Sequence, residues 1–257
     1  MPPPSLFVIV PGFGRPHLAE KFDILRNNLQ VIQSYPWSKL KIRVCVYDPD
    51  AIASLPEDLR NHPDIEWIVE PGIVGQYIKR NAHPETVAGY TYMLIVLDDI
   101  KLHNNVSFDT LLRYDAMFRF DIYSPSMCSE SKYQFEYMLS KPAMISHILA
   151  TTACEAFCYF MPLASFTKYY EHIEPDKNPW LWGMDMCILK CIGLRPAILN
   201  HMVMTHYYKN ECYALRADKD PVEGYNYVME KYGVSTAELS EQKAVFYHII
   251  DTELFPT

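Results

Sequence analysis

The sequence predicts an α/β fold: a mostly parallel central sheet flanked by helices, followed by a helical C-terminal extension. Apolar runs at 6–10 and 92–97 are typical of strands that are buried on both faces, and helical patterns alternate with them. The hydrophobic share of 49% in 257 residues allows a large core. We find no internal repeat and no Gly/Ser-rich linker. We therefore expect one domain over 1–257, with a first half at about 5–105, a second half at about 106–210 and an extension at 211–257.

The first half alternates strands with helices. The run at 6–10 leads into a turn at 11–16, rich in Gly and Pro. The helix that follows has apolar residues at intervals of four, three, four and three, namely Leu18, Phe22, Leu25, Leu29 and Ile32. Further strands are predicted at 41–47, 65–69 and 92–97, and further helices near 53–60 and 73–82. Helical crossovers make such strands parallel, so ligands are expected beyond their carboxyl ends.

The second half is less regular, and its elements are predicted one by one. Helices are expected near 107–118, over 163–171 and from about 185 to 191, and strands at 155–160 and near 202–206. The C-terminal segments 221–232 and 236–250 have patterns that favour helices.

Composition excludes several classes of protein. The 23 basic and 31 acidic residues give a net charge of −8, which argues against a dedicated nucleic-acid binder. No apolar stretch approaches the roughly 18 residues of a membrane span, and no signal peptide precedes the first strand, so we expect no stable membrane insertion and a cytoplasmic location. Seven cysteines in CxxxC or isolated positions favour free thiols. P-loop and GxGxxG signatures are absent from the sequence.

Two adjacent carboxylates, Asp98 and Asp99, directly follow the most apolar predicted strand. Burying such a pair without partners would be costly, whereas a strand end lets the carboxylates reach solvent. A hard divalent cation, Mg²⁺ or Mn²⁺, would relieve their repulsion and complete its shell with phosphate oxygens and water. The alternative is an acidic pair that stabilises a turn or caps a helix.

Two later segments add candidate groups. Trp180-Leu181-Trp182-Gly183-Met184-Asp185 places an acid at a predicted helix start, where it can act as a general base beside indole rings that stack on a sugar. The alternative is a helix-start acid with core tryptophans. His206 ends a short strand and could be a metal ligand, with His201 as the competing candidate.

In this order the motifs resemble the GT-A class of nucleotide-sugar glycosyltransferases, over most of residues 5–210. The segment TACEAFCYFMPLASF (152–166), followed by WGMD, is similar to the short soluble glycosyltransferases of large algal (chlorella) viruses. The resemblance implies a GT-A-like, Rossmann-like sheet, a nucleotide-sugar donor (a UDP-sugar by class frequency) and Mn²⁺ or Mg²⁺. For a viral chain, the location would be the host cytoplasm.

The resemblance also implies roles for individual residues. Asp99 matches the last acid of the DxD motif and would bind the metal with His206; Leu97 replaces the first acid, and Asp98 would face the ribose or sugar. A register shifted by one moves the metal contact to Asp98. Asp185 matches the base of WGxD. The donor contacts are expected at Pro11, Gly12, Arg15, Tyr47, Asp48, Gln76, Lys79 (or Arg80) and Asp98, and the acceptor contacts at Glu155, Trp180, Trp182, Gly183 and Met184.

The expected function is transfer of a hexose or pentose from a nucleotide-sugar to a glycan hydroxyl, with metal assistance and inversion at the anomeric carbon. A retaining outcome stays open, as do the identity of the sugar, the acceptor and the oligomeric state. A nucleotidyltransferase or metal-dependent phosphohydrolase would also place acids at strand ends. A non-catalytic carbohydrate-binding protein would instead use Trp180 and Trp182 without metal-dependent nucleotide affinity.

Overall fold

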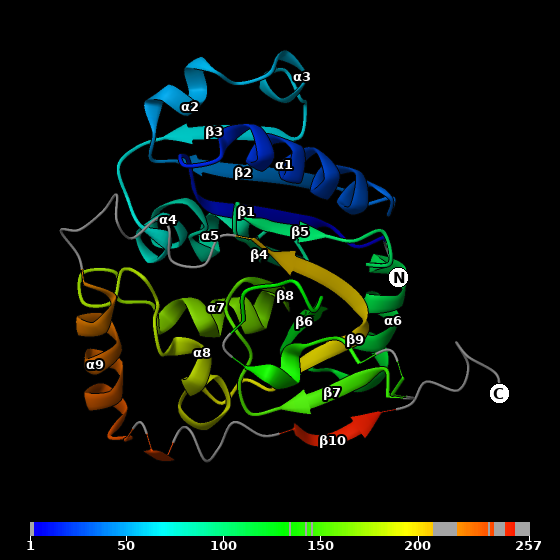
Figure 1. Cartoon of the computed structure of the whole chain (residues 1–257), viewed down its shortest axis with the longest axis vertical. Coiled ribbons are helices and arrows are strands. Elements are labelled where there is room, and N and C mark those ends of the chain that lie inside the picture. Colours follow the sequence, from blue (N-terminus) through cyan, green and yellow to red (C-terminus); the bar gives the residue numbers. More distant parts are fainter. Residues whose placement is uncertain are drawn as a thin grey trace.

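One sheet runs through the computed structural model, which describes residues 3–133, 135–141, 143–144, 146–207, 220–235 and 237–238, and the backbone of 245–249. Its described strands follow the order β10-β7-β9-β6-β8-β4-β1-β2-β3, and β5 pairs with β9 off this path. In Figure 1 the sheet extends from β3 at the top to β10 at the bottom.

The first half of the chain forms the parallel part of this sheet. Strand β1 (Leu6–Phe13) lies between β2 (Leu40–Val46) and β4 (Tyr92–Val96), and β2 pairs with β3 (Ile65–Val69), all parallel. The connecting helices are α1 (Leu18–Gln33), α2 (Pro49–Ala53), α3 (Glu57–Arg60), α4 (Val74–Asn81) and α5 (Pro84–Val87). The carboxyl ends of β1, β2 and β4 therefore meet at one edge, as predicted.

The second half adds mostly antiparallel pairs. Its elements are β5 (Ile100–Leu102), α6 (Phe108–Phe118), β6 (Ile122–Met127), a 3-10 turn (Glu136–Met138), β7 (Ile148–Thr151), β8 (Cys158–Pro162), α7 (Leu163–Glu171), α8 (Met184–Cys187) with a π-helical turn (Ile188–Ile192), β9 (Pro196–His206), α9 (Pro221–Tyr232) and β10 (Val245–Ile249). Strand β8 runs antiparallel to β4 and β6, whereas β6 and β9 are parallel.

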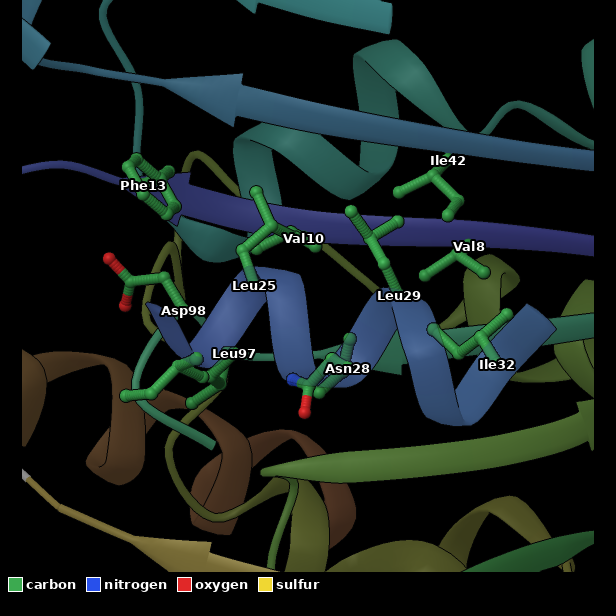
Figure 2. Close-up of a pocket in the computed structure, with 12 residues that line it drawn as sticks. Val8, Val10, Phe13, Leu25, Asn28, Leu29, Ile32, Ile42, Leu97 and Asp98 are labelled. Atoms are coloured by element: carbon green, nitrogen blue, oxygen red, sulfur yellow. The ribbon is translucent and has the colours of Figure 1, made fainter. Parts of the chain in front are cut away.

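One part of the core lies between α1 and the sheet. Leu25, Leu29 and Ile32 of α1 face Val8 and Val10 of β1, and all five are buried (Figure 2). Each such side chain contributes roughly 1.5–3 kcal/mol by leaving water. The gap that remains among them has a volume of about 10 Å³, close to the least that holds one water molecule. This apolar gap is a packing defect rather than a ligand site.

The predicted fold class is confirmed, but individual elements differ in both halves. The helix expected near 53–60 is two short helices, α2 and α3, and β1 continues to Phe13 into the expected turn. The helix expected over 236–250 is wrong at Val245–Ile249, which forms β10 and pairs antiparallel with β7. The segment is rich in β-branched and aromatic residues, which favour a strand with an available partner. The remainder of that expected helix lies outside the described residues, apart from Ala237 and Glu238. The helix predicted over 221–232 is confirmed as α9. Among the described residues, no helix is both long and apolar enough to cross a membrane.

Candidate functional site

The loop that carries Asp98 and Asp99 is held on both sides by other elements. The Asn28 side chain of α1 donates to the Ile100 carbonyl (2.7 Å) and accepts from the Leu102 N–H (2.8 Å), which docks β5 against the helix. Strand β5 then pairs antiparallel with the end of β9, with Ile100 opposite His206. This register places Asp99 and His206 side by side.

Asp99 and His206 form a buried pair. The Asp99 Oδ2 lies 3.3 Å from the His206 Nε2, and the two side chains are 13% and 5% exposed. The His206 Nδ1 lies 2.6 Å from the Lys132 carbonyl oxygen. Because a carbonyl can only accept, Nδ1 carries the proton, and in the neutral ring Nε2 presents its lone pair toward Asp99. Burial lowers the pKa of His206, but the hydrogen bond and the charge of Asp99 outweigh it and raise that pKa above its ordinary value.

The chemistry of this pair fits a hard divalent cation. Adjacent ligands on an octahedral ion with bonds of 2.0–2.1 Å lie about 3 Å apart, which is close to the spacing of Asp99 and His206. A carboxylate oxygen and an imidazole nitrogen oriented by a backbone carbonyl suit Mn²⁺ better than Mg²⁺, which prefers oxygen ligands. Within the described ranges, no cluster of three or more His, Cys, Asp or Glu residues could enclose a metal. A two-residue site would leave the other coordination positions to phosphate oxygens and water.

Asp98 points the other way, toward α1 and the turn after β1. Its Oδ2 lies 2.7 Å from the Lys21 Nζ and accepts from the Gly14 N–H at 3.3 Å. In Figure 2 its carboxylate is directed away from the apolar gap. Burial raises the pKa of Asp98, whereas the charge of Lys21 opposes that rise. The two adjacent acids thus have separate partners.

The ends of β1 and β2 bring three of the predicted donor residues together. The Arg15 guanidinium bonds to both Asp48 oxygens (2.5 and 3.0 Å) and lies 3.0 Å from Asp50. The Tyr47 hydroxyl donates to the Arg15 carbonyl. Burial tends to raise the pKa of Asp48, but hydrogen bonds from Arg15 hold it below the ordinary value. Both carboxylate oxygens of Asp48 thus accept hydrogen bonds from Arg15, whose side chain is 58% exposed at the edge of the sheet.

The other predicted donor residues are more scattered. Pro11 and Gly12 belong to β1 itself, which continues to Phe13. The Gln76 side chain accepts from the Ile73 N–H (3.0 Å) and caps its own helix. The Lys79 Nζ bonds to the Tyr170 carbonyl (2.7 Å) and lies over the ring of that tyrosine, so its contacts join α4 to α7 rather than to the strand-end acids. The alternative, Arg80, bonds to the Pro71 carbonyl.

The predicted acceptor segment is a tight loop before α8. Leu181 and Gly183 have positive φ angles of 61° and 80°, on either side of the half-buried Trp182. A non-glycine residue in this conformation is strained, and such residues gather at functional sites. Trp180 is buried, and the Asn178 amide donates to the Trp182 carbonyl (2.8 Å). Met184, also buried, begins α8.

The charge of Glu155 affects the pKa values of two residues of the site, Tyr137 and His206. Burial raises the pKa of Tyr137, and the charges of Asp185 and Glu155 raise it further. The charge of Glu155 also contributes to the raised pKa of His206. Glu155 is buried and accepts from the Phe135 N–H at 2.8 Å. Glu155 therefore lies within electrostatic range of both the Asp99–His206 pair and the surroundings of the partly exposed Asp185.

Sequence reasoning missed the residues that orient this site. Lys21 and Asn28 hold the acidic loop, the Lys132 carbonyl orients His206, and the Phe157 ring packs on that imidazole with centroids 4.1 Å apart. Only the helix residues left a signal, because Lys21 and Asn28 are seven apart beside the apolar stripe of α1.

Solved structures share this fold at low sequence identity. The crystal structure of GalNAc-T7 with UDP, GalNAc and Mn²⁺ matches 89% of this chain and 48% of its own, with a TM-score of 0.64 and 12% identity. The crystal structure of S. aureus TarS 1-349 matches 78% of this chain and 60% of its own, with a TM-score of 0.54 and 15% identity. This chain thus spans about half to three fifths of the length of these structures. No protein-family model and no curated protein matches its sequence. The fold is GT-A-like.

Proposed function

We propose that this chain is a metal-dependent glycosyltransferase that moves a sugar from a nucleotide-sugar to a glycan hydroxyl. The observation that carries the proposal is the Asp99–His206 pair, 3.3 Å apart beyond the end of β4, with His206 oriented by the Lys132 carbonyl. The GalNAc-T7 structure of the same fold holds UDP and Mn²⁺, which supports a UDP-sugar donor and a divalent cation.

On the donor side, the Asp99 oxygen and the His206 Nε2 would hold Mn²⁺ or Mg²⁺. When bound, the ion supplies Lewis-acid stabilisation of the departing diphosphate. The end of β1 at Gly12 and the following turn with Arg15 would border the nucleoside. Asp48 and Tyr47 keep that turn in position through Arg15. Pre-positioning of this kind lowers the barrier by reducing the freedom lost on binding.

On the acceptor side, Asp185 would act as general base. The acceptor hydroxyl gives its proton to the Asp185 carboxylate while its oxygen attacks the anomeric carbon. The bond from that carbon to the diphosphate breaks, and the nucleoside diphosphate leaves with the electron pair. Attack opposite to the leaving group inverts the anomeric centre. The half-buried Trp182 offers a ring against which a sugar face can stack.

The test is calorimetric titration of UDP into the protein with and without Mn²⁺. The wild type should bind UDP at least tenfold more tightly with Mn²⁺, and Asp99→Asn should lose that difference. Asp23→Asn is the matched control, since Asp23 is a carboxylate of α1 that is 77% exposed. Absence of UDP binding in either condition, or an unchanged Asp99→Asn, would contradict the proposal. A donor screen that detects free UDP with transferred sugar then separates transfer from nucleotidyl transfer and phosphate hydrolysis.

A further inference from the structure

A buried lysine contacts the turn that borders the candidate donor site. Lys21, in the first turns of α1, is 4% exposed, although lysine is almost never fully buried without a partner. Its ammonium contacts the Asp98 carboxylate at 2.7 Å and donates to the Gly14 carbonyl at 2.8 Å. The contact with Gly14 links the loop that carries Asp98 to the turn after β1.

The Lys21–Asp98 pair holds one residue of the turn after β1, Gly14, through both its N–H and its carbonyl. The Gly14 N–H donates to Asp98 and the Gly14 carbonyl accepts from Lys21. On the opposite side the turn is closed by Tyr47, because a Cβ added to Gly14 would lie 2.5 Å from its ring. The next residue, Arg15, is the exposed cation of this edge. The position of Arg15 therefore depends on how firmly Lys21 and Asp98 hold Gly14.

We propose that Lys21 is a positioning residue for donor binding: through the Gly14 carbonyl it holds Gly14, and with it Arg15, in the conformation that receives the nucleoside diphosphate. The same ammonium keeps Asp98 turned away from Asp99, so that Asp99 faces the cation site alone. The inference rests on the proposed function for its ligand, but its structural part, the gripped turn, stands on the contacts of the nucleotide-free chain.

A buried ion pair that served stability alone would behave differently when both charges are removed. Loss of one partner leaves an unpaired buried charge and is strongly destabilising, whereas removal of both is often tolerated. A double-mutant cycle of Lys21→Met and Asp98→Asn therefore separates the two roles. Lys21→Met should lower Tm strongly in the wild-type background and much less in the Asp98→Asn background.

The affinity for UDP with Mn²⁺ should not follow that pattern. We expect Lys21→Met to weaken UDP binding about tenfold in both backgrounds, because in each the Gly14 carbonyl loses its charged donor. Amide hydrogen exchange within residues 12–17 of the nucleotide-free protein should accelerate in both backgrounds as well. The matched control is Arg26→Met, which removes a partly exposed cation of the same helix, paired with Asp58 at 2.6 Å; it should change neither UDP affinity nor amide exchange.

Two results would overturn the proposal. One is recovery of UDP affinity together with Tm in the Asp98→Asn background, which would make Lys21 a purely structural partner. The other is unchanged exchange of residues 12–17 when Lys21→Met is introduced into that background. If the wild type fails to bind UDP, the proposed function fails, and the exchange measurement alone then decides whether Lys21 holds the turn.

Discussion

Substitution of Gly14 by alanine tests the packing of the turn that borders the candidate donor site. The added Cβ would lie 2.5 and 2.7 Å from two atoms of the Tyr47 ring and 2.9 Å from the Asp48 Cβ. Ordinary carbon contacts begin near 3.5 Å, so the turn or the ring must move by about 1 Å. Tyr47 is tied to the Arg15 carbonyl, and Asp48 is buried, so neither neighbour yields freely. Overpacking and the strained hydrogen bond together cost roughly 2–4 kcal/mol.

The assay is thermal unfolding together with UDP titration. A domain of this size loses about 2–4 °C of Tm per kcal/mol, so Gly14→Ala should lower Tm by roughly 5–15 °C. Affinity for UDP with Mn²⁺ should fall more than tenfold, because the displaced turn carries Arg15. Gly89→Ala is the matched control: there the added Cβ meets only the flexible end of Lys39, at 3.2 Å, and both measurements should stay at wild-type values.

A second substitution shows whether the clash itself is responsible. Tyr47→Ala in the Gly14→Ala background removes the obstructing ring and should recover much of the lost Tm. UDP affinity should stay weak, because Tyr47 no longer holds the Arg15 carbonyl. A Gly14→Ala protein with wild-type Tm and wild-type UDP affinity would refute the reasoning, because the turn would then have room that the structure does not show.

Three further predictions concern single side chains. Asp185→Asn should lower turnover at least about a hundredfold and leave UDP affinity nearly unchanged, as initial rates and calorimetry would show; wild-type turnover would exclude Asp185 as the base. His206→Gln should raise the Mn²⁺ concentration for half-maximal activity more than about tenfold, and an unchanged Mn²⁺ dependence would remove His206 from the cation site. Hydrogen bonds from Lys231 and Tyr227 lower the pKa of Glu174, so their stabilisation is complete at neutral pH and is lost as the pH falls through that lowered value. The Tm difference between the wild type and Glu174→Gln should therefore shrink from pH 7 to pH 3, and a difference independent of pH would contradict this sign.

The parallel part of the sheet was predictable because local pattern and burial agree there. The run Leu6–Val10 is buried on both faces, and the stripe of α1 covers one of them, so hydrophobicity alone identifies both elements. Strand β6 was missed because Ser124, Pro125 and Ser126 interrupt its apolar character. The Ser126 hydroxyl donates to the Asn200 and Met202 carbonyls of β9, so a distant strand makes that polar residue tolerable in the core.

The candidate site was predictable in its residue types but not in their pairing. Acids beyond an apolar strand were visible in the sequence, yet the choice between Asp98 and Asp99 depends on β5. That strand has three residues, and its pairing with β9 and its contacts with Asn28 of α1 set the direction of the loop before it. Local sequence does not encode a contact between Asp99 and His206, because a register between separated strands is a property of the folded chain.

The separate partners of Asp98 and Asp99 should make the binding of Mn²⁺ depend on the nucleotide. Two carboxylates facing one site would carry two negative charges into a buried environment and would attract a cation even without substrate. Here Lys21 neutralises Asp98, and Asp99 faces an imidazole that can give up its Nε2 proton. A single carboxylate with one neutral nitrogen neutralises only half the charge of a dication, and diphosphate oxygens would supply the remaining negative charge. We therefore expect Mn²⁺ to bind weakly to the free protein and much more tightly with UDP, which titration of Mn²⁺ with and without UDP would show. Equal Mn²⁺ affinity in both conditions would mean that the protein side chains alone satisfy the ion. That result would contradict the inference that Asp99 is the one carboxylate of the cation site while Asp98 is paired with Lys21.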